Sequence, residues 1–86
     1  MGVLQDLTEA LAKDVIEAQD ELGDDRFYEK VSKVLLDMSP TTQEAYMTAV
    51  RVILAERKAR KFLEAALKAK RTGGVAPQAP RDTVGH

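Results

Sequence analysis

The stretch from Pro40 to about Arg71 constrains the fold of this chain more than any other, because no glycine or proline interrupts it after its first position. Proline suits the first position of a helix but disfavours helical geometry in the residue before it, so a helix is predicted to begin at Pro40. Ser39 is then the expected N-cap, while the spacing of Thr41 and Glu44 also allows a capping box one turn later. A helix of this length spans about 48 Å.

Two shorter helices are predicted before this segment, over residues 3–22 and 26–38. In each, apolar residues recur every three or four positions, which is the period of one helix face. Gly23 can adopt the left-handed conformation that ends a helix, and Asp24 or Asp25 can cap the next one. The predicted apolar faces are Leu4, Leu7, Leu11, Val15, Ala18 and Leu22 in the first helix and Phe27, Val31, Val34, Leu35 and Met38 in the second.

These elements predict an all-α fold: a three-helix antiparallel bundle with a long third helix. The short link after Gly23 makes the first two helices neighbours. We expect a single helical domain over residues 1–71. Residues 72–86 contain three Gly and two Pro without periodicity, which favours a disordered tail.

The apolar pattern changes along the long helix, near Glu56. Before Glu56 apolar residues cover a broad face, which predicts burial on more than one side. After Glu56 they form a narrower face that has fewer predicted neighbours. One seam with alternating spacings of four and three, typical of coiled coils, runs through both halves. Its members are Ala45, Ala49, Val52, Glu56, Ala59, Leu63 and Ala66.

The first two helices together are about as long as the third and could cover its length, but if they pack as a compact hairpin on its first half, the apolar residues of its second half are exposed. An exposed stripe of this kind favours a partner site, and two-fold homodimers are the commonest oligomers. We therefore expect a homodimer, although the first helix could instead fold back over the stripe. The candidate partner-binding residues are Leu54, Ala59, Phe62, Leu63, Ala66 and Leu67.

Charge is distributed unevenly along the chain. Up to Glu44 there are eleven acidic and four basic residues, whereas from Ala45 onward there are three acidic and nine basic residues. The bases of the long helix predict a ridge for an acidic partner or for phosphates, or simply a solvated face. No aromatic residue interleaves with them for base stacking. This basic ridge comprises Arg57, Arg60, Lys61, Lys68 and Arg71.

Few residues suit catalysis or metal binding. The only histidine is His86, at the end of the predicted tail, and there is no cysteine. We therefore expect no enzyme activity, no cofactor and no metal site. The lack of cysteine fits a reducing compartment, and no apolar run approaches the ~20 residues that cross a bilayer. These features predict a cytoplasmic protein without a membrane segment.

The function favoured by the sequence is that of a small non-enzymatic protein–protein interaction module. A regulator, an adaptor, a chaperone-like subunit or an assembly subunit would each fit, acting through helix–helix contacts of the long third helix. The alternative is a nucleic-acid-binding accessory protein that uses the basic ridge.

Overall fold

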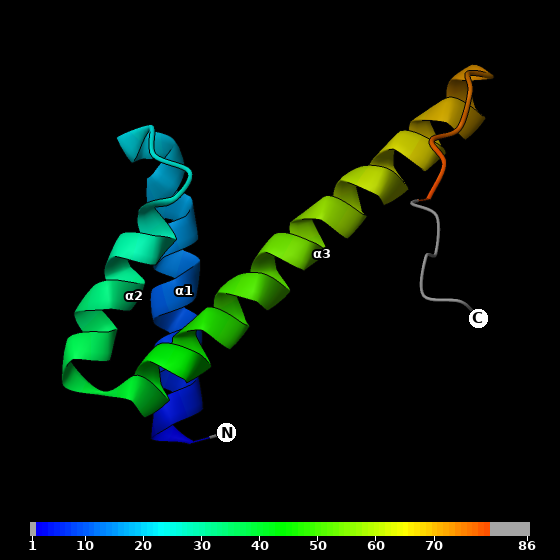
Figure 1. Ribbon diagram of the computed structural model, residues 1–86. Helices are drawn as coiled ribbons and strands as arrows, with labels where there is room; N and C mark the ends of the chain where they lie inside the picture. Colours follow the sequence, from blue (N-terminus) through cyan, green and yellow to red (C-terminus); the bar gives the residue numbers. More distant parts are fainter. Residues whose placement is uncertain (1, 80–86) are drawn as a thin grey trace. The chain divides into compact units, whose positions relative to one another are not determined.

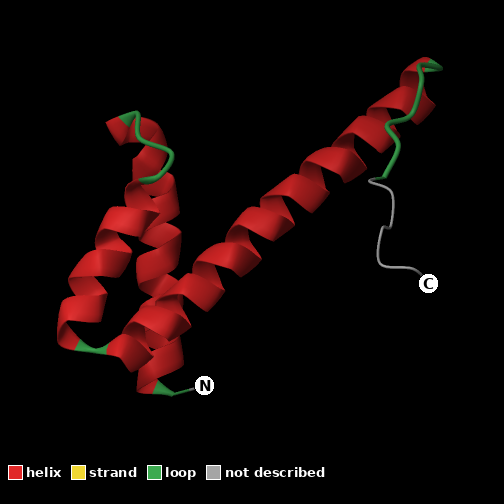
Figure 2. Cartoon of the chain, in the orientation of Figure 1, coloured by secondary structure: helices red, strands yellow, loops and turns green. Residues whose placement is uncertain are grey.

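Most of the described chain is helical. The computed structural model describes residues 2–79 (Figure 1). Within that range there are three helices, α1 (Val3–Leu22), α2 (Phe27–Met38) and α3 (Pro40–Thr72), and no strand (Figure 2). The predicted all-α class and the three successive helices are confirmed. The boundaries differ from the predicted ones by one residue, at Phe27 and at Thr72.

Contacts within the chain divide it into two units, residues 1–55 and residues 56–86. The first unit holds α1, α2 and the first half of α3, and the second half of α3 belongs to the other unit. Residues 73–79 have no regular secondary structure, but the Gly74 N–H donates to the Ala69 carbonyl at 2.9 Å. Of the predicted tail, residues 80–86 lie outside the described residues. A single domain over residues 1–71 stays a prediction.

A small aliphatic and aromatic core holds residues 2–55 together. Tyr46, Ile16 and Val50 are the largest side chains that are fully buried. Because Ile16 comes from α1 and the other two from α3, the core joins helices that are distant in sequence. The cluster consists of Ala12, Val15, Ile16, Tyr46, Ala49 and Val50. Helix α2 contacts α1 and adds half-buried side chains such as Phe27 and Leu35.

The buried face of α1 is rotated away from the predicted apolar face. Of the predicted residues only Val15 is buried, and leucines such as Leu7 are exposed. Ile16, which lies outside the predicted stripe, is in the core. The residues that α1 buries are Thr8, Ala12, Val15, Ile16 and Gln19. Two of these are polar, so hydrophobic periodicity alone could not locate the face.

The ends of the helices follow the predicted signals in two of three places. Gly23 has φ 66° and ends α1 in the left-handed conformation, as predicted. Ser39 Oγ accepts the Thr42 N–H at 3.1 Å, so of the two predicted starts of α3 the structure has the Ser39 cap. At the start of α2, however, neither Asp24 nor Asp25 is the N-cap, because that position is occupied by Arg26.

Candidate protein-interaction surface

The second half of α3 carries the predicted apolar residues on an exposed helix face. Phe62, Leu63 and Leu67 are 40%, 50% and 42% exposed, and helical spacing puts them on one side of α3 together with small alanines. We call this set the α3 stripe: Ala59, Phe62, Leu63, Ala66 and Leu67. Ala59 is exposed and Ala66 is half-buried.

Leu54 differs from the other predicted partner-binding residues. It is half-buried and packs against the core of residues 2–55, beside Ile53. Its helical position also lies away from the α3 stripe, because it is nine residues before Leu63 and falls on another face. The structure therefore brings five of the six predicted residues to one face of α3 and places Leu54 apart from them.

All five residues of the basic ridge are exposed. Arg60 is held by an ion pair with Glu56, in which Nε donates to the carboxylate at 2.7 Å. The segment 56–72 contains seven basic and two acidic residues, so its net charge is +5. An exposed helical segment with that charge favours acidic surfaces as partners.

Residues 2–55 also contain an open groove, which the sequence did not predict. Its volume is about 840 Å³, and it is lined by residues of α1 and of the first half of α3. We call it the α1/α3 groove. From α1 come Leu4, Gln5, Thr8, Glu9 and Lys13, and from α3 come Ala45, Thr48, Ala49, Val52 and Ile53. Small side chains at Ala45 and Ala49 leave space between the two helices.

The polar groups of the α1/α3 groove are partly satisfied by the protein itself. The Thr8 hydroxyl donates to the Leu4 carbonyl at 2.7 Å, so this buried residue does not need a ligand hydrogen bond. Gln5 donates to the Glu9 carboxylate at 2.9 Å on the exposed side of α1. What remains to be covered in the groove is mainly the apolar surface of Leu4, Val52 and Ile53.

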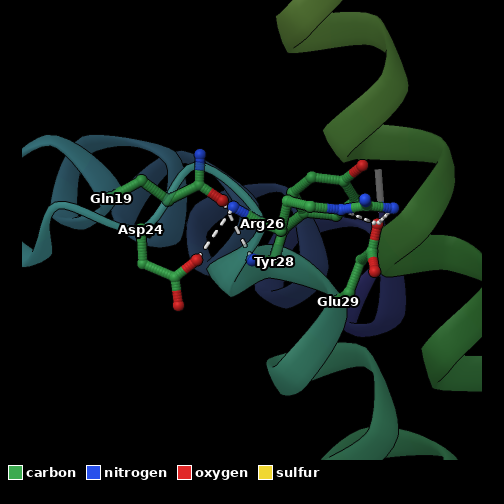
Figure 3. A network of polar contacts seen from close by, with 5 residues as sticks. All are labelled: Gln19, Asp24, Arg26, Tyr28 and Glu29. Atoms are coloured by element: carbon green, nitrogen blue, oxygen red, sulfur yellow. Dashed lines mark hydrogen bonds and ion pairs between the residues drawn. The ribbon is translucent and has the colours of Figure 1, made fainter.

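A second polar cluster surrounds the link between α1 and α2 (Figure 3). Asp24 Oδ1 accepts the Arg26 N–H at 3.1 Å, and Lys30 donates to Asp24 Oδ2 at 2.8 Å. The hydrogen bond from Lys30, followed by the one from the Arg26 backbone, lowers the pKa of the Asp24 carboxyl. Arg26 in turn pairs with Glu29. Asp24 therefore orders the link, rather than capping α2 as predicted.

The hydrogen bond that caps α2 comes from α1. Gln19 Oε1 accepts the Tyr28 N–H at 2.9 Å (Figure 3). The Gln19 side chain is buried. This bond satisfies one of the backbone donors that every helix leaves unpaired in its first turn. Sequence reasoning missed it because Gln19 and Tyr28 belong to different helices.

Replacing Gln19 with leucine is expected to destabilise the fold by about 1–3 kcal/mol, because the Tyr28 N–H loses its partner while the leucine stays buried. The free energy of unfolding from urea titration measures this cost. Gln78→Leu is the control, since Gln78 is exposed in the segment after α3. Equal stability of the two variants would show that the Gln19–Tyr28 bond contributes nothing.

Tyr46 joins α3 to α2 inside the core. Its side chain is 0% exposed, and its hydroxyl donates to the Tyr28 carbonyl at 3.0 Å. Burial raises the pKa of the Tyr46 hydroxyl to about 12, because the charged phenolate would be desolvated. The neutral, hydrogen-bonded form is therefore the one that the fold stabilises.

Among residues 2–79, no group of three or more His, Cys, Asp and Glu side chains is placed to hold a metal ion. None of the helices in this range is both long and apolar enough to cross a membrane.

Comparison of the sequence with known protein families and curated proteins, and of the structure with solved structures, found no match.

Proposed function

We propose that this chain is a small non-enzymatic protein–protein interaction module, such as a regulator, adaptor, chaperone-like subunit or assembly subunit. It works through helix–helix contacts of α3. The observation that carries the proposal is the exposure of Phe62, Leu63 and Leu67 on one face of α3. Clustered large apolar side chains on a helix surface are typical of partner sites. We also propose that the three helices form an antiparallel bundle.

The partner that we propose is a second copy of the chain. Residues 1–55 contain eleven acidic and five basic residues, a net charge of −6, whereas the segment 56–72 has a net charge of +5. Two copies can therefore attract one another through unlike parts of their surfaces. A symmetric pair buries both copies of the α3 stripe, so that association ends at a dimer.

Sedimentation equilibrium tests the proposal directly. At micromolar concentration we expect a mass near twice the 9.5 kDa of one chain. Moderate salt should weaken the dimer without abolishing it, because apolar contacts add to the electrostatic ones. A mass of one chain under all these conditions would contradict self-association.

Nucleic-acid binding by the basic ridge is the second candidate, favoured by the exposure of all five of its residues. A labelled DNA duplex, a single strand and an RNA hairpin, each titrated at low salt, distinguish it from the first. Salt-sensitive binding that is lost when Arg57, Arg60 and Lys61 become alanine would support this candidate. If no probe signal changes, nucleic-acid binding by the basic ridge is excluded, and the protein-interaction proposal remains.

A further inference from the structure

The α1/α3 groove and the α3 stripe are two surfaces of one chain that both expose apolar side chains. We propose that the groove of each copy receives the stripe of the other, with the two α3 helices paired antiparallel around a two-fold axis near Glu56. This inference rests on the self-association proposed above and adds the surface that the stripe occupies.

The first argument is the position of both surfaces along α3. The seam of the long helix divides at Glu56: Ala45, Ala49 and Val52 line the groove, whereas Ala59, Leu63 and Ala66 belong to the stripe. Ala49 and Leu63 lie equally far, seven residues, before and after Glu56. Reversing a second α3 about Glu56 therefore brings each stripe onto the groove-lining part of its partner.

The second argument is the size of the side chains. The groove has alanines at positions 45 and 49, whereas the stripe carries the large side chains Phe62, Leu63 and Leu67 beside its two alanines. Small residues in one half allow the large side chains of the other half to enter between α1 and α3. A volume of about 840 Å³ can hold several apolar side chains.

The third argument is charge, and it selects the antiparallel orientation. Parallel pairing would place two segments of net charge +5 beside each other along their whole length. Antiparallel pairing instead places each such segment against the unit of net charge −6 in the partner. Glu9 lines the groove, although Lys13 does so as well, so the attraction comes from the unit as a whole.

Disulfide trapping tests the register, because the natural chain contains no cysteine. Val52 and Ala59 are both exposed and lie on either side of Glu56. In the inferred dimer, Val52 of one copy is close to Ala59 of the other, but equal positions are about 9–12 Å apart along the axis. A disulfide needs Cα atoms within about 7 Å.

We expect neither Val52→Cys nor Ala59→Cys to cross-link alone under mild oxidation. In their equimolar mixture, random exchange of subunits puts one copy of each variant in about half of the dimers. Disulfides should therefore form in up to about half of the dimers. Glu56→Cys, near the axis, should cross-link with itself. Strong self-cross-linking of both Val52→Cys and Ala59→Cys would indicate parallel helices and overturn the inference.

A second pair of variants tests the α1 wall of the groove. Leu4 and Leu7 are exposed leucines of α1, three residues apart, but only Leu4 lines the groove. Leu4→Asp should raise the dimer Kd about ten-fold or more, whereas Leu7→Asp should leave it nearly unchanged. Equal effects of the two substitutions would exclude the groove as the receiving surface.

The outcomes separate this inference from the proposed function. Self-cross-linking of Leu63→Cys, with no mixed disulfide between positions 52 and 59, would mean that two stripes pack on each other. The proposed dimer would then be supported, but the α1/α3 groove would not be the surface that receives the stripe. A sedimentation mass of one chain would overturn the proposed self-association, and this inference with it.

Discussion

Leu63→Asp is expected to convert the proposed dimer largely into monomers, raising the dimer Kd about thirty-fold or more. Leu63 lies at the middle of the α3 stripe and is 50% exposed in the single chain, so the substitution has little core packing to disturb. In the dimer the new carboxylate would be buried against apolar side chains, and an unpaired charge in such a place is costly. Sedimentation velocity across a concentration series measures the change.

Arg57→Ala is the matched control for Leu63→Asp, because each substitution lowers the net charge by one. Arg57 belongs to the basic ridge, and its side chain is exposed on another side of α3. We expect its loss to change the dimer Kd by less than about three-fold at moderate salt. Equal weakening by both variants would show that charge rather than the stripe holds the dimer. Circular dichroism is the check that both variants stay helical.

Tyr46→Ala is expected to lower the free energy of unfolding by about 3–5 kcal/mol. The side chain is fully buried, and its removal leaves a cavity among Ile16, Val50 and their neighbours. It also leaves the Tyr28 carbonyl without the hydrogen bond that the hydroxyl donates. A loss of this size is a large part of the total stability of a small domain. Urea unfolding followed by circular dichroism gives the value.

Tyr46→Phe separates the packing of the ring from the hydrogen bond. The phenylalanine keeps the buried ring and loses only the bond to the Tyr28 carbonyl, so a cost of about 1 kcal/mol is expected. If Tyr46→Ala were no more destabilising than Tyr46→Phe, Tyr46 would not be central to the core. Both variants are compared with the natural protein at neutral pH, where the Tyr46 hydroxyl keeps its proton because burial raises its pKa to about 12.

Local signals in the sequence were sufficient for the helices and most of their ends. Gly23 and Ser39 act as predicted because their effects come from backbone conformation and from neighbouring N–H groups. Asp24 failed as a predicted cap because a residue from another helix, Gln19, supplies the hydrogen bond to α2. A donor and acceptor from separate helices leave no pattern along the chain.

The burial of polar residues explains why hydrophobic periodicity predicts the wrong buried face for α1. Thr8 and Gln19 can occupy core positions because their polar atoms are satisfied inside the protein, whereas apolar periodicity selects only apolar residues for the core. The leucines of α1 that were expected inside, such as Leu7, are then exposed. Only the packed arrangement shows which polar atoms find partners.

The sequence by itself determined that Pro40 begins a long helix and that its apolar pattern changes near Glu56. These properties depend on residues within a few turns, where propensity, capping and spacing act. The tertiary structure alone decided that α1 and α3 enclose a groove, that Leu54 packs on the core, and that Ile16 and Tyr46 meet inside it. The reason is physical: burial and shape depend on contacts between distant residues, and side-chain size along one helix does not fix what the next helix covers.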